Sequence, residues 1–207
     1  VFMLSHFHPD SLQKVLAPYR EVISQFNNPH NAFERIISTI SIAPTLKSDV
    51  YIGHTKSIEL ASLLGVQVDN RSPEKGFTWN GKAIAGRAET SVIFHEIAHW
   101  QLASPFRREL PDFGLGPGPE TGLKMLAQKF ICVSEKQKEE EEDLASLLGI
   151  LWEQALGGPA IVAFCEQNWL ELSERASTPM HFVKAFERLV EYDLIDEAGQ
   201  PVLPTAD

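Results

Sequence analysis

The sequence contains little cysteine and has no long apolar run. Only Cys132 and Cys165 among its 207 residues are cysteines, which excludes a disulfide framework. Both lie in apolar stretches with helical spacing, so we expect free core thiols, as suits a reducing cytosol. No apolar run is long enough to cross a bilayer, and the first residues lack the basic and apolar segments of a signal peptide. We therefore expect a cytoplasmic protein that does not bind membranes.

Positive charge is also scarce. The chain has 18 Lys and Arg residues against 28 Asp and Glu residues, which gives a formal net charge of −10. Binding to nucleic acid requires a basic face, so we expect no nucleic-acid partner. An acidic surface can attract a cationic substrate, but it also serves ordinary solubility. The charge alone does not choose between these two roles.

The length and pattern of the chain predict an α+β fold that is mostly helical. With 43% hydrophobic residues and no internal repeat, the chain can form one well-cored domain. We expect a single metal-binding domain, 1–207, with an N-terminal helical segment over 1–45 and a core over 46–207. Helical periodicity is clearest at 9–26, 32–37, 58–64, 121–134, 141–156, 159–176 and 179–192.

A small sheet is predicted before residue 90. Short β-branched runs at 50–53 and 66–68 indicate strands. Residues 77–84 have the pattern of a hairpin, because Asn80-Gly81 can supply two positive-φ residues for a tight turn.

The motif H-E-x-x-H at residues 95–99 carries the most chemical information in the chain. On a helix, His95 and His99 lie one turn apart on one face, so both imidazoles can bind one metal ion. Glu96 lies beside them, where it can handle the proton of a metal-bound water. The flanking residues are mostly apolar, which indicates a buried helix that ends where Ser104 meets Pro105. We expect one divalent metal ion, and the motif by itself suits iron and zinc equally.

A third protein ligand is expected in addition to the two histidines. The acidic run 139–143 leads into an apolar helical pattern, although acidic residues at a helix start are usually solvated. The apolar stripe of that helix projects back onto Glu140 and Glu141. Glu142 instead continues a face of small residues, which would allow the metal helix to approach closely. Histidines are rival ligands, with His54 the strongest, and the others are His6, His8, His30 and His181.

A longer motif follows the metal helix. The string His95-Glu96-Ile97-Ala98-His99-Trp100, then Ala103, Arg107-Arg108-Glu109-Leu110 and Asp112-Phe113-Gly114, resembles the elongation factor P hydroxylase family. The likeness resumes at 178–185 and covers about half of the chain.

The resemblance implies a specific activity. Members of that family hydroxylate a β-lysylated lysine on elongation factor P, with a metal held by H-E-x-x-H and a downstream glutamate. The resemblance therefore favours iron as the divalent metal ion, with zinc as the alternative. Alignment through 151–157 places that glutamate at Glu142, with Glu141 in reserve. Glu96 would then handle protons, and the mouth of the site would be shaped by Arg107, Arg108, Glu109 and Asp112. These four residues could equally form an ion-pair network that anchors their loop.

Two other functions fit the same residues. A zinc metallopeptidase with two histidines and one glutamate would use zinc to polarise the scissile carbonyl and Glu96 to deprotonate water. A non-catalytic interaction domain stabilised by metal would need no turnover. The ligand set and spacing suit both metals.

Overall fold

The computed structural model describes residues 9–42, 47–170 and 177–203, with the backbone alone at 9–11 and 47–52. The predicted α+β fold with mostly helical content is confirmed. Contacts divide the chain into two units, one containing residues up to 42 and from 150 to 203, the other residues 47–149. The predicted domain organisation (one domain, with a helical segment over 1–45) stays a prediction. Within the described residues, no helix is long and apolar enough to span a bilayer.

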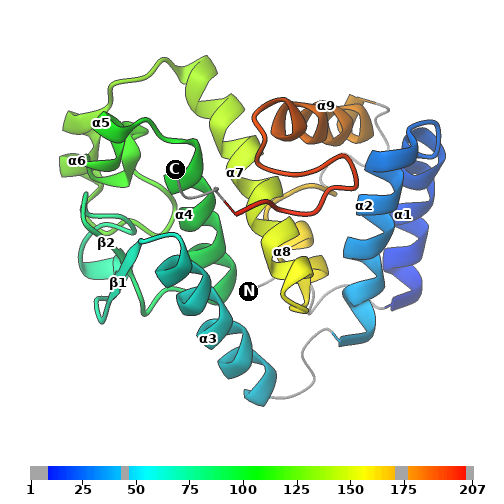
Figure 1. The fold of residues 1–207 in the computed structure, drawn as a ribbon, viewed down its shortest axis with the longest axis horizontal. Coiled ribbons are helices and arrows are strands. Elements are labelled where there is room, and N and C mark those ends of the chain that lie inside the picture. Colours follow the sequence, from blue (N-terminus) through cyan, green and yellow to red (C-terminus); the bar gives the residue numbers. More distant parts are fainter. Residues whose placement is uncertain (1–8, 43–46, 171–176, 204–207) are drawn as a thin grey trace. The chain divides into compact units, whose positions relative to one another are not determined.

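The first unit is helical (Figure 1). It packs around aromatic side chains. Tyr19 and Phe33 stack at 5.0 Å between ring centroids, and Phe164 and Phe182 contact both rings edge-on. All four are fully buried. The elements of this unit are α1 (Pro9–Ile23), α2 (Asn27–Ser38), η2 (Thr39–Ile42), the end of α7 (Glu135–Ala155), α8 (Ala160–Glu166) and α9 (Ser177–Glu191).

The second unit contains the predicted small sheet and the predicted metal helix (Figure 1). Its two strands pair in parallel, with Val68 opposite Ile84. The elements are α3 (Lys47–Leu63), β1 (Gln67–Asp69), η3 (Pro73–Lys75), β2 (Ala83–Ala85), α4 (Thr90–Leu102), α5 (Pro105–Arg108), η4 (Asp112–Gly114), α6 (Lys124–Ala127), η5 (Gln128–Phe130) and the first part of α7.

The predicted strand at 50–53 is wrong, because these residues belong to helix α3. The buried residues Ser57, Leu60, Ala61 and Leu64 follow a helical period. Gly53 extends the same face backwards, since a Cβ there would lie 3.4 Å from Thr90. The helical spacing of the buried residues therefore determines the structure of this segment, although its β-branched residues favour a strand. The helix predicted at 121–134 is shorter than expected and ends at residue 130. Within the range predicted as a helix at 159–176, α8 ends at Glu166, and residues 171–176 lie outside the described residues.

The predicted hairpin is present, but its turn is of another type. Trp79 and Ile84 form an antiparallel bridge around Asn80-Gly81. Only Gly81 has a positive φ, 85°, because the Asn80 side chain instead accepts hydrogen bonds from the backbone of Lys82 and Ala83. A Cβ at Gly81 would lie 2.4 Å from the Glu109 carbonyl oxygen. This close contact, together with the positive φ, requires glycine.

The two cysteines differ in their surroundings. Cys165 is buried on α8, as predicted, whereas Cys132 is exposed and lies outside the helices. The prediction of a core thiol at Cys132 is therefore wrong, because the helical spacing around it forms only short turns. Both cysteines are free.

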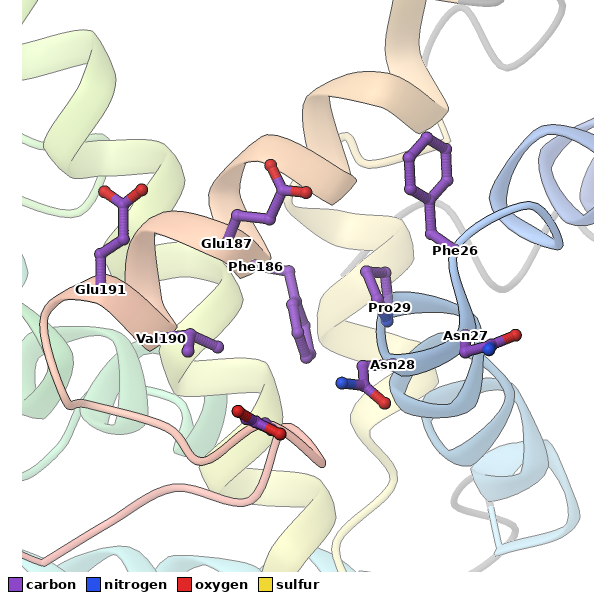
Figure 2. Close-up of a pocket in the computed structure, with 9 residues that line it drawn as sticks. Phe26, Asn27, Asn28, Pro29, Phe186, Glu187, Val190 and Glu191 are labelled. Atoms are coloured by element: carbon purple, nitrogen blue, oxygen red, sulfur yellow. The ribbon is translucent and has the colours of Figure 1, made fainter.

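An open pocket of about 590 Å³ lies in the first unit, between the start of α2 and α9 (Figure 2). Pro29 and Phe186 are its buried apolar lining residues. The carboxylates of Glu187, Glu191 and Glu197 are exposed around it. No histidine or cysteine is among the lining residues. The residues with the strongest chemical signal lie in the other unit.

Glu153 is a buried carboxylate in the first unit, and we expect it to destabilise the fold at neutral and alkaline pH. It is 5% exposed and its Oε2 has no hydrogen-bond partner among the described residues. Burial and the nearby Glu166 carboxylate raise its pKa from 4.5 to about 7. The Glu153 carboxyl binds its proton more tightly in the folded than in the unfolded state. The free energy of unfolding therefore falls by roughly 3 kcal/mol as the pH rises from 4.5 to about 7.

Glu153→Gln is therefore expected to be more stable than wild type at pH 8, by up to roughly 3 kcal/mol, and much closer to it at pH 5. Urea unfolding at the two pH values measures the difference. An equal effect of the substitution at both pH values would contradict this account.

Candidate metal centre

The predicted motif residues lie on α4, a mostly apolar helix with Ile93, Phe94 and Ile97 buried. The helix ends at Leu102, two residues before Ser104, whose side chain accepts a hydrogen bond from Arg107 at the start of α5. The end of α4 therefore lies close to the Ser104-Pro105 step, where the sequence predicts that the helix ends. His99 is 3% exposed and Glu96 is 8% exposed, whereas the His95 side chain retains 20% exposure. The helix therefore brings two imidazoles and a carboxylate to a largely buried site.

Helix α7 brings Glu142 to the same place. The small-residue face predicted to contact the metal helix is confirmed: Ala145 and Ser146 are buried. A Cβ on Gly149 would lie 3.1 Å from the backbone nitrogen of His95. The backbones of the two helices thus approach closely, which a larger residue at 149 would prevent.

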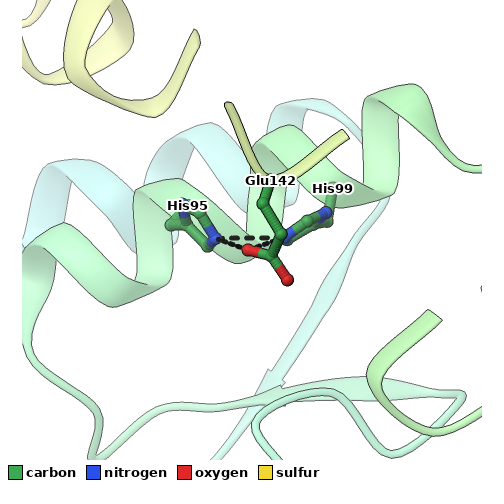
Figure 3. Close-up of side chains that lie close together, drawn as sticks. All are labelled: His95, His99 and Glu142. Carbon is green, nitrogen blue, oxygen red and sulfur yellow. Dashed lines mark hydrogen bonds and ion pairs between the residues drawn. The ribbon is translucent and has the colours of Figure 1, made fainter. Parts of the chain in front are cut away.

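His95, His99 and Glu142 form a group that could hold a metal ion. The two histidine Nε2 atoms lie 3.0 Å apart, and Glu142 Oε2 lies 3.3 Å from that of His95 and 3.4 Å from that of His99. Figure 3 shows the three side chains pointing toward one another. Ligand atoms about 2.1 Å from one ion, at angles between octahedral and tetrahedral, lie about 3.0–3.4 Å apart. The donor atoms therefore fit one divalent ion.

The charges within this group also favour a cation. Burial alone would lower the pKa of His99, but the Glu142 and Glu141 carboxylates raise it to about 10. Burial alone would raise the pKa of Glu142, but His99 and His95 hold it well below its usual range. In the absence of metal, the positive charge of a proton on the histidines therefore balances the negative charge of the Glu142 carboxylate. A divalent cation can take the place of that proton.

Glu96 is the buried carboxylate beside the ligand group. Burial raises its pKa to about 8, and the nearby Asp112 and Glu142 carboxylates add to that rise, while His99 opposes it. A group with this pKa can accept and release a proton near neutral pH.

Glu141, the reserve ligand, has a different position. Its Oε1 lies 3.3 Å from His99 Nδ1, the nitrogen that does not face His95 and Glu142. Its two carboxylate oxygens accept hydrogen bonds of 2.6 and 2.7 Å from the Arg107 guanidinium. Glu141 therefore contacts His99 from outside the group that could hold the ion.

The loop after the metal helix closes one side of the centre. Phe113 stacks on the His99 ring at 5.6 Å and on Trp79 at 5.1 Å between centroids. Its backbone is left-handed, with φ 53°, as are its neighbours Asp112 at 44° and Gly114 at 69°. Non-glycine residues rarely adopt such angles, and they often do so at functional sites.

The four predicted loop residues contact different groups. Arg107 binds Glu141 and donates to the Phe113 carbonyl, while Arg108 stacks on the Trp100 ring, 3.8 Å from its centroid, and donates to the Trp100 carbonyl. Asp112 is buried and accepts a hydrogen bond from Thr121. Glu109 is exposed. Arg107, Arg108 and Asp112 anchor the loop through these contacts. Contact of any of the four residues with substrate stays a prediction.

None of the rival histidines that the structure describes belongs to the group that could hold a metal ion. His54 is on α3 and does not follow a strand, so the reason for preferring it is gone. His30 lies 3.8 Å from Glu34 on α2, and the His181 ring contacts Trp169. His6 and His8 lie outside the described residues. The contacts of Phe113 and Glu141 with His99 were not predicted, because they join segments that are far apart in the chain.

Comparison with protein-family models, with curated proteins and with solved structures found no match to this chain.

Proposed function

We propose that this chain is a metal-dependent enzyme in which His95, His99 and Glu142 hold one divalent ion. The observation that carries the proposal is the spacing of the three donor atoms, 3.0, 3.3 and 3.4 Å. Two imidazoles and one carboxylate leave coordination positions open, as in the facial-triad oxygenases. This ligand set supports catalysis better than a closed structural site, which would use four protein ligands.

Within this class we propose a non-haem iron hydroxylase that acts on a lysine of elongation factor P. The support is the resemblance carried by H-E-I-A-H-W, R-R-E-L and D-F-G. Residues from these three segments contact one another in the structure, since Arg107 binds the Phe113 carbonyl and Phe113 stacks on His99. Bound iron would supply the activation of dioxygen. A reducing, cytoplasmic location would suit ferrous iron and is part of the same proposal.

The residues of the chain itself would bind the substrate and handle its protons. The exposed carboxylate of Glu140 lies two residues before Glu142 on α7, where it can attract a cationic lysine side chain. Glu96 would hold or release a proton beside the ligand histidines. Phe113 and Trp79 would exclude water from the His99 side of the centre.

A zinc metallopeptidase is the second candidate. The observation that favours it is Glu96, whose pKa of about 8 beside two metal-ligating histidines suits a general base for water. A peptidase also needs a surface to align an extended peptide, which enzymes often provide with a strand edge. Strands β1 and β2 are each three residues long, so they offer little edge for this purpose.

Oxygen consumption separates the two candidates. The chain is purified without oxygen, loaded with ferrous iron or zinc, and mixed with elongation factor P carrying the modified lysine, with dioxygen and with ascorbate as reductant. Ascorbate supplies the two electrons that reduce the second atom of dioxygen to water. We expect the ferrous form alone to consume oxygen and to add about 16 mass units, one oxygen atom, to the substrate, as chemistry at open iron positions requires. Peptide cleavage by the zinc form, with no oxygen consumed by the ferrous form, would reject the hydroxylase.

A further inference from the structure

The Arg107–Glu141 pair, meaning the guanidinium of Arg107 and the carboxylate of Glu141, connects the loop after α4 with helix α7. Both carboxylate oxygens of Glu141 are engaged by Arg107, at 2.6 and 2.7 Å. The two side chains are 15% and 12% exposed. A bidentate pair that is mostly buried fixes the plane of the carboxylate far better than an exposed ion pair does.

The fixed carboxylate faces one nitrogen of His99. Glu141 Oε1 lies 3.3 Å from His99 Nδ1, and His99 Nε2 lies on the other side of the ring, 3.0 Å from His95 Nε2. When Nδ1 donates to a carboxylate, the neutral ring keeps its lone pair on Nε2, the nitrogen that a metal needs. The partner of Nδ1 thus determines whether Nε2 is ready to bind.

Arg107 also fixes the face of the same ring. Its Nε donates to the Phe113 carbonyl at 2.9 Å, and the Phe113 ring stacks on His99 with 28° between the planes. Phe113 has a positive φ, so its position depends on contacts such as this one. One guanidinium therefore holds both the hydrogen-bond partner of His99 and the ring that packs against it.

We propose that the Arg107–Glu141 pair positions His99 for metal binding, with Glu141 and Arg107 as positioning residues that do not touch the ion. This assigns Arg107 a role at the metal rather than at the substrate. The inference rests on the metal centre of the proposed function, but it does not depend on whether the reaction is hydroxylation or hydrolysis.

Cobalt titration of the full chain tests this role. Co²⁺ has visible absorption bands that report the ligand set, and a chelator competition gives its dissociation constant. For Glu141→Gln we expect about a 10- to 100-fold weaker affinity, the loss typical of a partner behind a ligand histidine. The bands of the saturated protein should keep their shape, because the three ligands remain. Arg107→Lys, which keeps the charge but loses the bidentate geometry, should also weaken binding.

Glu139→Gln is the matched control, since it removes the same charge from an exposed position of the same helix. It should bind Co²⁺ as wild type does. If Glu141→Gln and Arg107→Lys both stay within twofold of this control, the positioning role is rejected while the metal centre stands. If Glu141→Gln changes the bands of the saturated protein as removal of a ligand does, Glu141 is itself a ligand. If wild type binds no Co²⁺, the centre and the positioning role fall together.

Discussion

Replacing Glu142 by alanine is expected to lower the affinity of the chain for divalent metal by about 100-fold or more, since it removes one of the three proposed protein ligands. In the proposed centre the Glu142 carboxylate would contribute the oxygen donor, and its Oε2 lies 3.3 Å and 3.4 Å from the histidine Nε2 atoms. Its side chain is 38% exposed, so its removal leaves no buried cavity and the variant should fold. Competition with a chromophoric chelator measures the change.

The matched control for this substitution is Glu139→Ala, which shortens an exposed glutamate on the same helix. It should bind metal with the affinity of wild type. If Glu142→Ala also kept that affinity, then Glu142 would not be a ligand and the third donor would have to be sought elsewhere.

Glu96→Gln is expected to reduce turnover by about 10²–10⁴-fold, the range for loss of a proton-transfer group. Glutamine has nearly the same shape, and the pKa of about 8 shows that the buried site already tolerates a neutral group at this position. The variant should therefore fold and bind metal with an affinity near that of wild type. Turnover is measured by oxygen consumption, or by peptide hydrolysis if the zinc form proves active.

The matched control is Glu89→Gln, which removes a carboxylate from the exposed residue just before the same helix. Glu89→Gln should retain full turnover. Full activity in Glu96→Gln would rule out proton handling by Glu96. If neither wild type nor Glu96→Gln shows turnover in either assay while both bind metal, the result would fit the non-catalytic interaction domain.

The parts of the site that depend on spacing within one helix could be predicted from the sequence. H-E-x-x-H fixes His95 and His99 on one face because a helix has 3.6 residues per turn. The small residues Ala145, Ser146 and Gly149 predicted a close helix contact, and Gly149 makes it. The small sheet before the metal helix could be predicted because β-branched and turn residues mark it locally.

The parts that depend on contacts between distant segments could not be predicted. Glu141 and Glu142 are adjacent in an acidic run, and only the packing of α7 on α4 shows that one faces His99 Nδ1 and the other His99 Nε2. The bond from Arg107 to Glu141 spans 34 residues. At 50–53 the local β-branched run was misleading, because packing of the helix outweighed its strand preference.

Elemental analysis after anaerobic purification tests the central claim most directly. Wild type, Glu142→Ala and Glu139→Ala are prepared side by side and their metal content is measured. A single site predicts about one iron or zinc per chain in wild type and Glu139→Ala, and little in Glu142→Ala. Iron would support the hydroxylase and zinc the peptidase. If wild type contained no metal and took up none on addition of ferrous iron or zinc, the proposed centre would be contradicted.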